Sequence, residues 1–453
     1  MGMFSSLRGH GRRRWFVIGG VLLAVVAAGV VAAVLLTRQP GNVSHPDVEF
    51  TAEPPPPAPA IQKTKNPFDD GFTWANYHYN ATRTGNLALR VPPRPPFVEQ
   101  WSVTGRTLIE FPPVICGRSL YLLKNNGALY KISRANGKVK WKKKLGYLAA
   151  ASPACGGRSV YAVILARQKG VDAGSAVAVN ASNGRVRWSR NLPSRSESSP
   201  LLIGDRVYFG SENGTVYALR ASDGAVRWTY HAGGAVKGGL AFAGGKLFFG
   251  DYSGKLTAVR KTDGSRVWQS SSAGTHFGFT AGSFYGTPAV AFGRVYVGSL
   301  DGFMYSFGSS DGKLAWRYKT SGYVYSSPAV ADPPGVGPSV YVGSYDGNLY
   351  GFDARSGSVR WVHNAHGTIS GGPVVIGDLV FYSNLTKRST GALGVGTGKF
   401  VWGIGRGAFN PVISDGRRLY LNGYSSLFML TTPRQARLDR KALRGKAAAP
   451  PAK

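Results

Sequence analysis

Residues 200–228, PLLIGDRVYFGSENGTVYALRASDGAVRW, decide the fold because similar copies of this stretch recur along the chain. Seven copies end in a tryptophan, and an eighth tryptophan precedes the first copy. A period of about 40 residues with several strand signals per copy is typical of a β-propeller, in which each repeat forms one blade. The tryptophans that mark this period are Trp101, Trp141, Trp188, Trp228, Trp268, Trp316, Trp361 and Trp402.

Within one repeat the strands can be located directly. Residues 207–210 and 215–219 are β-branched and aromatic, and Asn213-Gly214 lies between them. Asn-Gly and Asp-Gly favour the positive φ of tight hairpin turns, so we interpret the repeated Asp and Asn residues as turn formers and not as metal ligands. The repeated tryptophans are predicted to be structural, each ring filling the gap between two neighbouring blades.

Counting repeats predicts eight blades. Eight inner strands are expected, opened by Pro113, Pro153, Pro200, Leu240, Pro288, Pro328, Pro373 and Pro411. The last repeat stops before any tryptophan, whereas the Trp101 strand has no blade before it. The Trp101 strand therefore completes the blade that spans residues 411–430. This closure removes sheet edges that would otherwise promote aggregation. The fold class is predicted as an all-β, eight-bladed propeller over residues 71–433.

The N-terminus predicts a membrane anchor. Residues 15–36 are apolar and uncharged. This stretch is long enough to cross a bilayer as a helix. Arginines cluster before this stretch, so residues 1–14 are expected in the cytoplasm and the propeller outside, with a single pass at 15–37. A cleaved signal peptide is the alternative, although its apolar core would be only about 7 to 15 residues. The arginines are Arg8, Arg12, Arg13 and Arg14.

Two further segments flank the propeller. Residues 38–70 contain the run Pro54-Pro55-Pro56-Pro57 and are predicted to be an extended linker that holds the domain away from the bilayer. Residues 434–453 are rich in Arg, Lys and Ala and are predicted to be a disordered basic tail.

The charge of the chain is strongly positive, and most of it lies in the propeller. The formal net charge is +33, and residues 97–432 hold 38 Lys and Arg against 16 Asp and Glu, a net +22. Such a field attracts polyanions, for example anionic lipid head groups or acidic wall polymers. Nucleic acid fits poorly with a domain outside the membrane. The alternative is a basic surface that serves only solubility.

The chain contains only two cysteines, Cys116 and Cys155, in corresponding strands of adjacent predicted blades. In an oxidising exterior they could form a disulfide. Two buried free thiols are the alternative, and the sequence does not decide between them.

The repeat resembles a known family. The residues Ser198-Ser199-Pro200, Ser326-Ser327-Pro328 and Gly343-Ser344, with the tryptophan series, are similar to the pyrroloquinoline quinone (PQQ)-type propeller repeat, and residues 74–86 resemble the lead-in before such propellers. The resemblance covers residues 71–433. It implies the fold but not the activity, because the family includes PQQ- and Ca²⁺-dependent dehydrogenases and also non-catalytic propellers, such as the lipoprotein of the outer-membrane β-barrel assembly machinery.

Several features of the sequence argue against the dehydrogenase branch. Those enzymes carry a vicinal cysteine pair, whereas Cys116 and Cys155 belong to different repeats. Most carboxylates of the propeller lie in turns, and no Cys-x-x-Cys-His haem motif is present. The seven histidines form no Ser/His/Asp or zinc arrangement. We therefore predict no catalytic, metal or cofactor-binding residues, and PQQ with Ca²⁺ belongs only to the alternative function.

One position of the repeat predicts a binding site. The residue three before each inner-strand opening should face the axial funnel, and it changes character between copies while its Ser/Gly-rich frame does not. Packing therefore does not dictate this position, and such a ring could hold a peptide segment or small polar ligand. The alternative is a solvated ring without function. The polar and aromatic members are Glu110, Glu197, Lys237, Tyr285, Tyr325 and Ser370; Ala150 and Ala408 complete the ring.

The longest of these loops is unusually aromatic. It could form a protein-binding knob, fold over the funnel as a lid, or simply bury its rings. The candidate interface residues are His276, Phe277, Phe279 and Phe284.

The sequence thus favours a membrane-anchored, extracytoplasmic scaffold in cell-envelope assembly or maintenance. Its expected partners are envelope proteins or anionic wall polymers, and no nucleic acid. The alternatives are a PQQ/Ca²⁺-dependent quinoprotein-like oxidoreductase and a receptor for small ligands or glycans.

Overall fold

The computed structural model describes residues 21, 24–27, 29, 41–51, 66–274 and 282–447. The chain divides into two compact units, residues 1–42 and 43–453. The predicted span 15–37 lies mostly outside the described residues. Among the described residues, no helix is both long and apolar enough to cross a bilayer.

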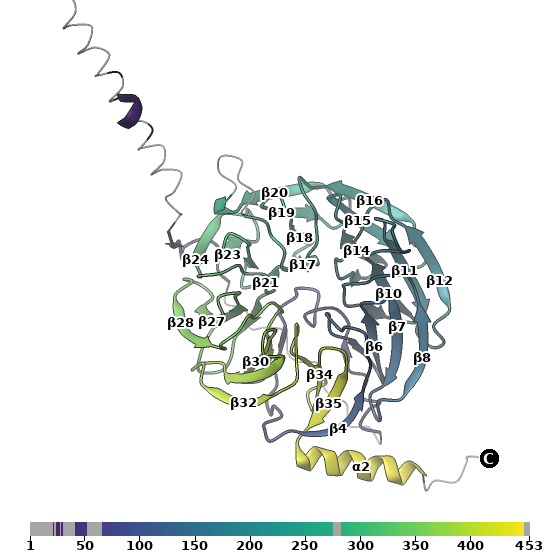
Figure 1. Ribbon diagram of the computed structural model, residues 1–453. Coiled ribbons are helices and arrows are strands. Elements are labelled where there is room, and N and C mark those ends of the chain that lie inside the picture. The colour runs from purple at the N-terminus through teal and green to yellow at the C-terminus, as the bar shows by residue number, and fades with distance from the viewer. Residues whose placement is uncertain are drawn as a thin grey trace, which may run out of the picture. The chain divides into compact units, whose positions relative to one another are not determined.

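The second unit is a ring of eight antiparallel sheets (Figure 1), which confirms the predicted eight-bladed propeller. Blades 1 to 4 each consist of four consecutive strands, ordered from the axis to the rim. Blade 1 is β5 (Val114–Cys116), β6 (Ser119–Lys124), β7 (Ala128–Ser133) and β8 (Val139–Lys144). Blade 2 is β9 (Ala154–Gly156), β10 (Ser159–Ile164), β11 (Ser175–Asn180) and β12 (Val186–Asn191). Blade 3 is β13 (Leu201–Ile203), β14 (Arg206–Gly210), β15 (Thr215–Arg220) and β16 (Val226–His231). Blade 4 is β17 (Ala241–Ala243), β18 (Lys246–Gly250), β19 (Lys255–Arg260) and β20 (Arg266–Ser271).

Blades 5 to 7 repeat this pattern, and blade 8 takes its outer strand from the start of the domain. Blade 5 is β21 (Ala289–Ala291), β22 (Arg294–Gly298), β23 (Phe303–Gly308) and β24 (Leu314–Lys319). Blade 6 is β25 (Ala329–Ala331), β26 (Ser339–Gly343), β27 (Asn348–Asp353) and β28 (Val359–Asn364). Blade 7 is β29 (Val374–Ile376), β30 (Leu379–Asn384), β31 (Ser389–Gly394) and β32 (Phe400–Ile404). Blade 8 is β33 (Val412–Ser414), β34 (Arg418–Asn422), β35 (Leu427–Thr431) and β4 (Val98–Val103).

The ring closes where the sequence predicts. Strand β4 pairs antiparallel with β35, and Trp101 lies opposite Met429. A buried ionic network joins the same seam. Arg134 of blade 1 contacts Asp70 at 3.0 Å and Asp415 of blade 8 at 2.6 Å, and all three side chains are fully buried. Because each charge has an opposite partner, the network fixes the two chain ends without leaving a buried charge uncompensated.

The repeated tryptophans act as the predicted wedges between blades. Trp188 of blade 2 donates a hydrogen bond of 2.9 Å from Nε1 to the carbonyl of Ala221 in blade 3. Its ring lies so close to Gly224 that a Cβ there would come within 2.6 Å of it. Gly224 is therefore needed both for its φ of 73° and for its missing side chain. Trp402 is an exception, because blade 8 takes its outer strand from elsewhere and lacks the matching turn. Phe97 packs edge-on against Trp402 instead, at 5.2 Å.

The segment 72–88, here called the axial segment, winds around the inside of the ring. It includes β2 (Thr73–Trp74), which pairs with β5, and β3 (Asn86–Leu87), which runs parallel to β29. In between, it accepts backbone hydrogen bonds from the middle residues of successive inner strands. These bonds run from Cys155 to Ala75, Phe242 to Ala81, Val290 to Thr82, Val330 to Thr84 and Val375 to Gly85. The axial segment thus occupies the channel that the inner strands enclose.

Arg83 locks the axial segment in place. Its guanidinium is fully buried and donates to the carbonyl oxygens of Tyr77, Leu240, Ser199 and Pro200, at 2.7 to 3.2 Å. Burial lowers the pKa of Arg83 to about 9, so the side chain remains protonated at neutral pH. One cation at the axis therefore ties the axial segment to blades 3 and 4.

The predicted linker 38–70 is partly folded, which corrects that prediction. Strand β1 (Val43–Ser44) adds a fifth strand to blade 5 beside β24, and Phe50 stacks on Phe292 at 5.6 Å. Hydrophobic contact and strand pairing hold these residues despite the neighbouring prolines. The proline run 54–57 lies outside the described residues.

The predicted disorder of the tail 434–453 is wrong for its first part. Residues Pro433–Ala447 form helix α2, which lies beside β4 in Figure 1. Thr432 caps it, accepting a hydrogen bond of 3.2 Å from the backbone N–H of Gln435. Asp439 makes two hydrogen bonds with the buried Arg418, at 2.6 and 2.7 Å. A single carboxylate facing a buried arginine thus folds a segment whose composition alone predicts disorder.

Candidate functional site

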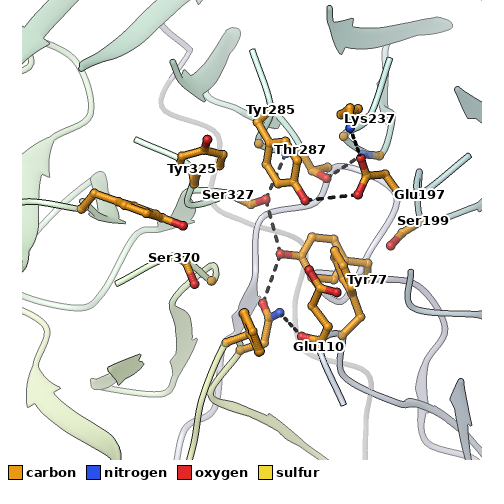
Figure 2. A pocket seen from close by; sticks show the side chains of 18 of the residues that line it. Tyr77, Glu110, Glu197, Ser199, Lys237, Tyr285, Thr287, Tyr325, Ser327 and Ser370 are labelled. Atoms are coloured by element: carbon orange, nitrogen blue, oxygen red, sulfur yellow. Dashed lines mark hydrogen bonds and ion pairs between the residues drawn. The ribbon is translucent and has the colours of Figure 1, made fainter. Parts of the chain in front are cut away.

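The loops before the inner strands converge on one pocket of about 320 Å³ at the propeller axis. These loops come from every blade except blade 2. Figure 2 shows the labelled side chains pointing into the pocket from several blades. The six polar and aromatic residues of the predicted ring all line it: Glu110, Glu197, Lys237, Tyr285, Tyr325 and Ser370. The two alanines of the ring, Ala150 and Ala408, are buried and are not among the lining residues.

Tyr77 of the axial segment contributes to the pocket wall from within the ring. Its hydroxyl lies 3.4 Å from Ser327 Oγ and 3.2 Å from Asn410 Oδ1 (Figure 2). Burial raises the pKa of Tyr77 to about 12, so the phenol is neutral at physiological pH. The axial segment thus supplies a polar but uncharged contact to the pocket.

One side of the pocket holds a compact ionic cluster. Lys237 Nζ lies 2.7 Å from Glu197 Oε1 and 3.2 Å from Glu212 Oε1, and 5.3 Å from the ring centre of Tyr252. Burial raises the pKa of Glu197 more than Lys237 lowers it. Burial acts to lower the pKa of Lys237, but its two carboxylate partners outweigh it, so this pKa is raised. The lysine is therefore fully engaged within the protein.

Glu110 is the second carboxylate of the pocket and has a different environment. Its Oε2 accepts a hydrogen bond of 2.9 Å from Asn125 Nδ2. Among the described residues, no Lys or Arg forms an ion pair with it. Burial raises its pKa, and the neutral amide offsets this only in part. Glu110 is thus a partly buried carboxylate without a cationic partner.

Tyrosine rings form a row along another part of the wall. The ring centres of Tyr252 and Tyr285 are 6.4 Å apart, those of Tyr285 and Tyr325 are 5.1 Å apart, and those of Tyr325 and Tyr345 are 4.6 Å apart. At the rim, Tyr323 packs edge-on against Tyr325 and is 55% exposed. These rings supply flat apolar surface with hydroxyl groups attached.

Part of this wall was not predicted from the sequence. Tyr252 and Tyr345 occupy one position of the repeat, two residues after Gly250 and Gly343. The same position holds Glu212 in blade 3, so a second comparison between repeats would have found them. Tyr77 belongs to no repeat, and periodicity carries no signal for it.

The aromatic loop before blade 5 is only partly described. His276, Phe277 and Phe279 lie outside the described residues. Phe284 is fully buried and packs edge-on against Tyr305 at 5.8 Å, so this ring belongs to the core and not to an exposed knob.

The two cysteines and the turn carboxylates have structural positions. Cys116 of β5 and Cys155 of β9 form a disulfide between blades 1 and 2. Asp and Asn side chains of the turns accept backbone hydrogen bonds; Asn213 Oδ1, for example, accepts from the N–H of Thr215 at 3.2 Å. Within the described ranges, no group of three His, Cys, Asp or Glu residues could hold a metal ion.

The chemistry available in the pocket is that of binding. Its described lining contains two glutamates, one lysine, five tyrosines and several Ser and Gly residues, but no His, Cys or Asp. Lys237 is neutralised by its partners, and burial raises the pKa of the tyrosines Tyr77, Tyr252 and Tyr285. The wall therefore offers hydrogen bonds, aromatic faces and one unpaired carboxylate.

Comparison with known families identifies the propeller. A family model described as outer membrane protein assembly factor BamB matches residues 83–235, 164–281 and 232–432, which together cover more than half of the chain. The chain belongs to this family. The resemblance to PQQ-like repeats stated from the sequence is thereby confirmed. No curated protein matches the chain.

Solved structures with the same fold include a BamB protein, a quinohemoprotein alcohol dehydrogenase and a designed protein. BamB from Moraxella catarrhalis is 18% identical, with a TM-score of 0.59, over 74% of this chain and 98% of that one. The quinohemoprotein alcohol dehydrogenase ADHIIG from Pseudomonas putida is 13% identical, with a TM-score of 0.67, over 79% of this chain and 80% of that one. A computationally designed protein, Ika8, is 12% identical with a TM-score of 0.61, over 74% of this chain and 99% of that one. At these identities the likeness concerns the fold alone.

Proposed function

We propose that this chain is a non-catalytic scaffold of the cell envelope, anchored by its N-terminal segment, that binds partner proteins through the axial pocket of its propeller. The observation that carries the proposal is the convergence on one pocket of six side chains that blade packing does not dictate. Pocket-lining aromatic and charged residues on a rigid ring are well suited to hold a partner segment.

The arrangement of the charged groups supports binding over catalysis. A nucleophilic side chain needs a neighbouring base or a lowered pKa to activate it. Glu197 is instead held by Lys237, and Glu110 faces an amide of Asn125. The pKa values of the pocket tyrosines Tyr77, Tyr252 and Tyr285 are raised by burial, which disfavours a phenolate nucleophile.

Membrane anchoring rests on the sequence. Residues 15–37 have the length and composition of a spanning helix, and the arginines before them favour a cytoplasmic N-terminus. Under this proposal the propeller faces the exterior, where a disulfide such as Cys116–Cys155 is stable. The name of the family also points to envelope assembly, although the lipoprotein anchor of its relatives is replaced here by the predicted span.

A basic strand suits anionic wall polymers as additional partners. Between Glu110 and Asp172 the chain has 12 Lys and Arg and no Asp or Glu. Five of them form the lysine strand, defined here as the exposed lysines on and just before β8: Lys138, Lys140, Lys142, Lys143 and Lys144. Among the described residues, no carboxylate forms an ion pair with any of these five. A row of ammonium groups whose charge no described carboxylate neutralises attracts a linear polyanion.

Photocrosslinking in intact membranes tests the scaffold. Replacing Tyr323 at the pocket rim by p-benzoylphenylalanine should trap a discrete protein partner. The same replacement of Phe400, which is 59% exposed on the outer strand β32, is the matched control. If crosslinked partner bands are absent at both Tyr323 and Phe400, or equally strong at both, the proposal is wrong.

The second candidate is a quinoprotein-like oxidoreductase, favoured by the likeness to the alcohol dehydrogenase fold. The donor set of the pocket fits Ca²⁺ poorly, since the ion takes about six to eight oxygen ligands and the pocket offers two carboxylates, one of them bound to Lys237. A thermal-shift titration with PQQ and Ca²⁺ distinguishes the two. Saturating binding at about 100 times Kd should stabilise the fold by about 2.7 kcal/mol if the oxidoreductase is correct.

A further inference from the structure

The axial pocket differs in charge from the propeller that surrounds it. Residues 97–432 carry a net +22, whereas the described lining of the pocket has two glutamates against one lysine. We infer that the pocket binds a cationic group, an alkylammonium or a guanidinium, between Glu110 and the tyrosine row. This inference rests on the proposed function and names the class of ligand.

The first support is Glu110. Its carboxylate is partly buried, accepts one hydrogen bond from Asn125 and has no ion-pair partner among the described residues. Leaving a carboxylate in such a site is unfavourable unless a charge or hydrogen bonds compensate it. A cation in the pocket supplies that compensation, whereas an anion would add repulsion.

The second support is the tyrosine row. The rings of Tyr285, Tyr325 and Tyr345 follow one another at 5.1 and 4.6 Å between centres. Glu110 lines the same pocket as Tyr285 and Tyr345, so its carboxylate shares this space with the tyrosine row. Aromatic faces attract cations, and the attraction strengthens where water is excluded.

The third support is Lys237, which already shows the proposed chemistry inside the protein. Its ammonium lies between two carboxylates, Glu197 and Glu212, and faces the ring of Tyr252 at 5.3 Å. Because it is engaged in this way, Lys237 is not free to receive an anion. Glu110 and the remaining tyrosines repeat the same elements, and no Lys or Arg of the described residues forms an ion pair with Glu110.

The size and polarity of the pocket limit the ligand. A volume of about 320 Å³, bounded from within the ring by Tyr77, admits the end of a side chain or a small amine. The hydroxyl of Ser370 lines the pocket and is buried without a hydrogen-bond partner in the described part of the chain. It can accept a hydrogen bond from an ammonium or guanidinium N–H group. The source of the cation is therefore a free amine or a basic side chain of a protein partner.

Calorimetry with the full-length protein in non-ionic detergent tests the inference. The probes are n-butylammonium and n-butylguanidinium, with n-butanol as the neutral analogue and acetate as the anion. We expect saturable binding of both cations only. Glu110→Gln should weaken it at least about tenfold, equivalent to about 1.4 kcal/mol. Asp172→Asn, a loss of the same charge at a side chain that is 92% exposed, is the control and should change nothing.

Two variants at Tyr325 separate the aromatic face from the hydroxyl. Tyr325→Phe keeps the ring and should bind within about threefold of the native protein, whereas Tyr325→Leu should weaken binding about fivefold or more. Circular dichroism and the melting temperature confirm that each variant is folded. If Glu110→Gln is folded and binds the cations as well as the native protein, the inference is wrong. Stronger binding of butanol, acetate or a glycan also overturns it.

A competition experiment distinguishes the two sources of the cation. A protein partner predicts that the capped tripeptide Gly-Lys-Gly competes more strongly than butylammonium, whereas a free amine predicts the reverse order. Failure of all cations, with crosslinks at Tyr323 still present, would refute the ligand class and leave the scaffold proposal intact. Loss of the crosslinks with cation binding retained would refute the scaffold alone.

Discussion

The guanidinium of Arg83 donates a hydrogen bond of 2.7 Å to the carbonyl oxygen of Tyr77, six residues earlier in the axial segment. The same side chain reaches the carbonyls of Leu240, Ser199 and Pro200. Tyr77, which lines the pocket from within the ring, is therefore joined to blades 3 and 4 through one buried cation.

Replacing Arg83 by Met should destabilise the propeller by at least about 3 kcal/mol, because four buried carbonyl oxygens lose their donor at about 1 to 3 kcal/mol each. Methionine keeps most of the length of the side chain, so the effect reports the lost hydrogen bonds. Denaturant unfolding followed by tryptophan fluorescence measures it. The control is Arg90→Met, because Arg90 is exposed and its replacement should leave the stability nearly unchanged. An Arg83→Met protein as stable as the native one would contradict this role.

His78 should make the fold sensitive to acid. Burial lowers its pKa from 6.5 to about 4, so the folded protein favours the neutral ring. The stabilising contribution is complete above pH 6.5 and is lost as the pH falls from 6.5 to 4, an effect of about 3 kcal/mol. As the pH falls from 7.5 to 4, the free energy of unfolding of the native protein, measured relative to that of His78→Asn, should therefore decrease by this amount. Asparagine tolerates the φ of 54° at this position. His366→Asn, with the same φ at an exposed site, is the matched control for the backbone conformation.

Asp439→Asn should destabilise blade 8 and release α2. The change removes the charge that faces the buried Arg418, and breaking one partner of a buried pair costs about 3 to 5 kcal/mol. Arg418 keeps Asp415 at 3.0 Å, so we expect the lower end of that range. The midpoint of unfolding and limited proteolysis after Thr432 measure the two effects. Asp172→Asn again serves as the control, and resistance of α2 to proteolysis in the Asp439 variant would speak against the prediction.

Removing the disulfide should cost about 4 kcal/mol, because the bond restricts the unfolded chain by that amount in the chain-entropy model. The loop length behind this figure is the sequence separation of 39 between Cys116 and Cys155. Comparing the double variant Cys116→Ala, Cys155→Ala with the native protein measures the cost. Non-reducing peptide mapping establishes the bond itself, and addition of a reductant should leave the double variant unchanged.

The lysine strand should dominate binding to linear polyanions. Reversing the charge at Lys140, Lys142 and Lys144 should weaken binding of long-chain polyphosphate and lower the slope of log K against log salt by about 2 to 3. Fluorescence titration over a range of salt concentrations measures both quantities. The control reverses Arg185, Arg187 and Arg227 to Glu, which are exposed at similar positions of blades 2 and 3. If the two triple variants weaken polyphosphate binding equally, binding depends on the overall positive charge and not on the lysine strand.

The periodic part of the fold was predictable. Of the unique segments, only residues 74–86 were recognised, by their resemblance to the lead-in before such propellers, and their place inside the ring was not predicted. The spacing of Trp188 and its equivalents marks each blade, and the unpaired Trp101 strand predicts the closure. The axial segment, β1 and α2 occur once each, so no repeat reveals them. Their positions depend on single tertiary contacts, such as Arg418 with Asp439.

The candidate site was recovered to the extent that it repeats. Comparing one position between blades found Glu110, Tyr285 and Tyr325, because blade packing leaves that position free to vary. It could not find Tyr77, which comes from the axial segment. Nor could it show that Lys237 is held by Glu197 and Glu212, since the side chains meet only across blades.

The outer strand of blade 8 has a consequence for how the protein is made. Strand β4 comes before all the other blade strands in the sequence, and its partner β35 comes after them. During synthesis, β4 therefore cannot pair until nearly the whole chain has been made. Contacts so distant in sequence form slowly. Until they form, β35 and the buried Arg134 lack their final neighbours. The nascent domain is therefore most exposed to aggregation and proteolysis just before its last blade is completed.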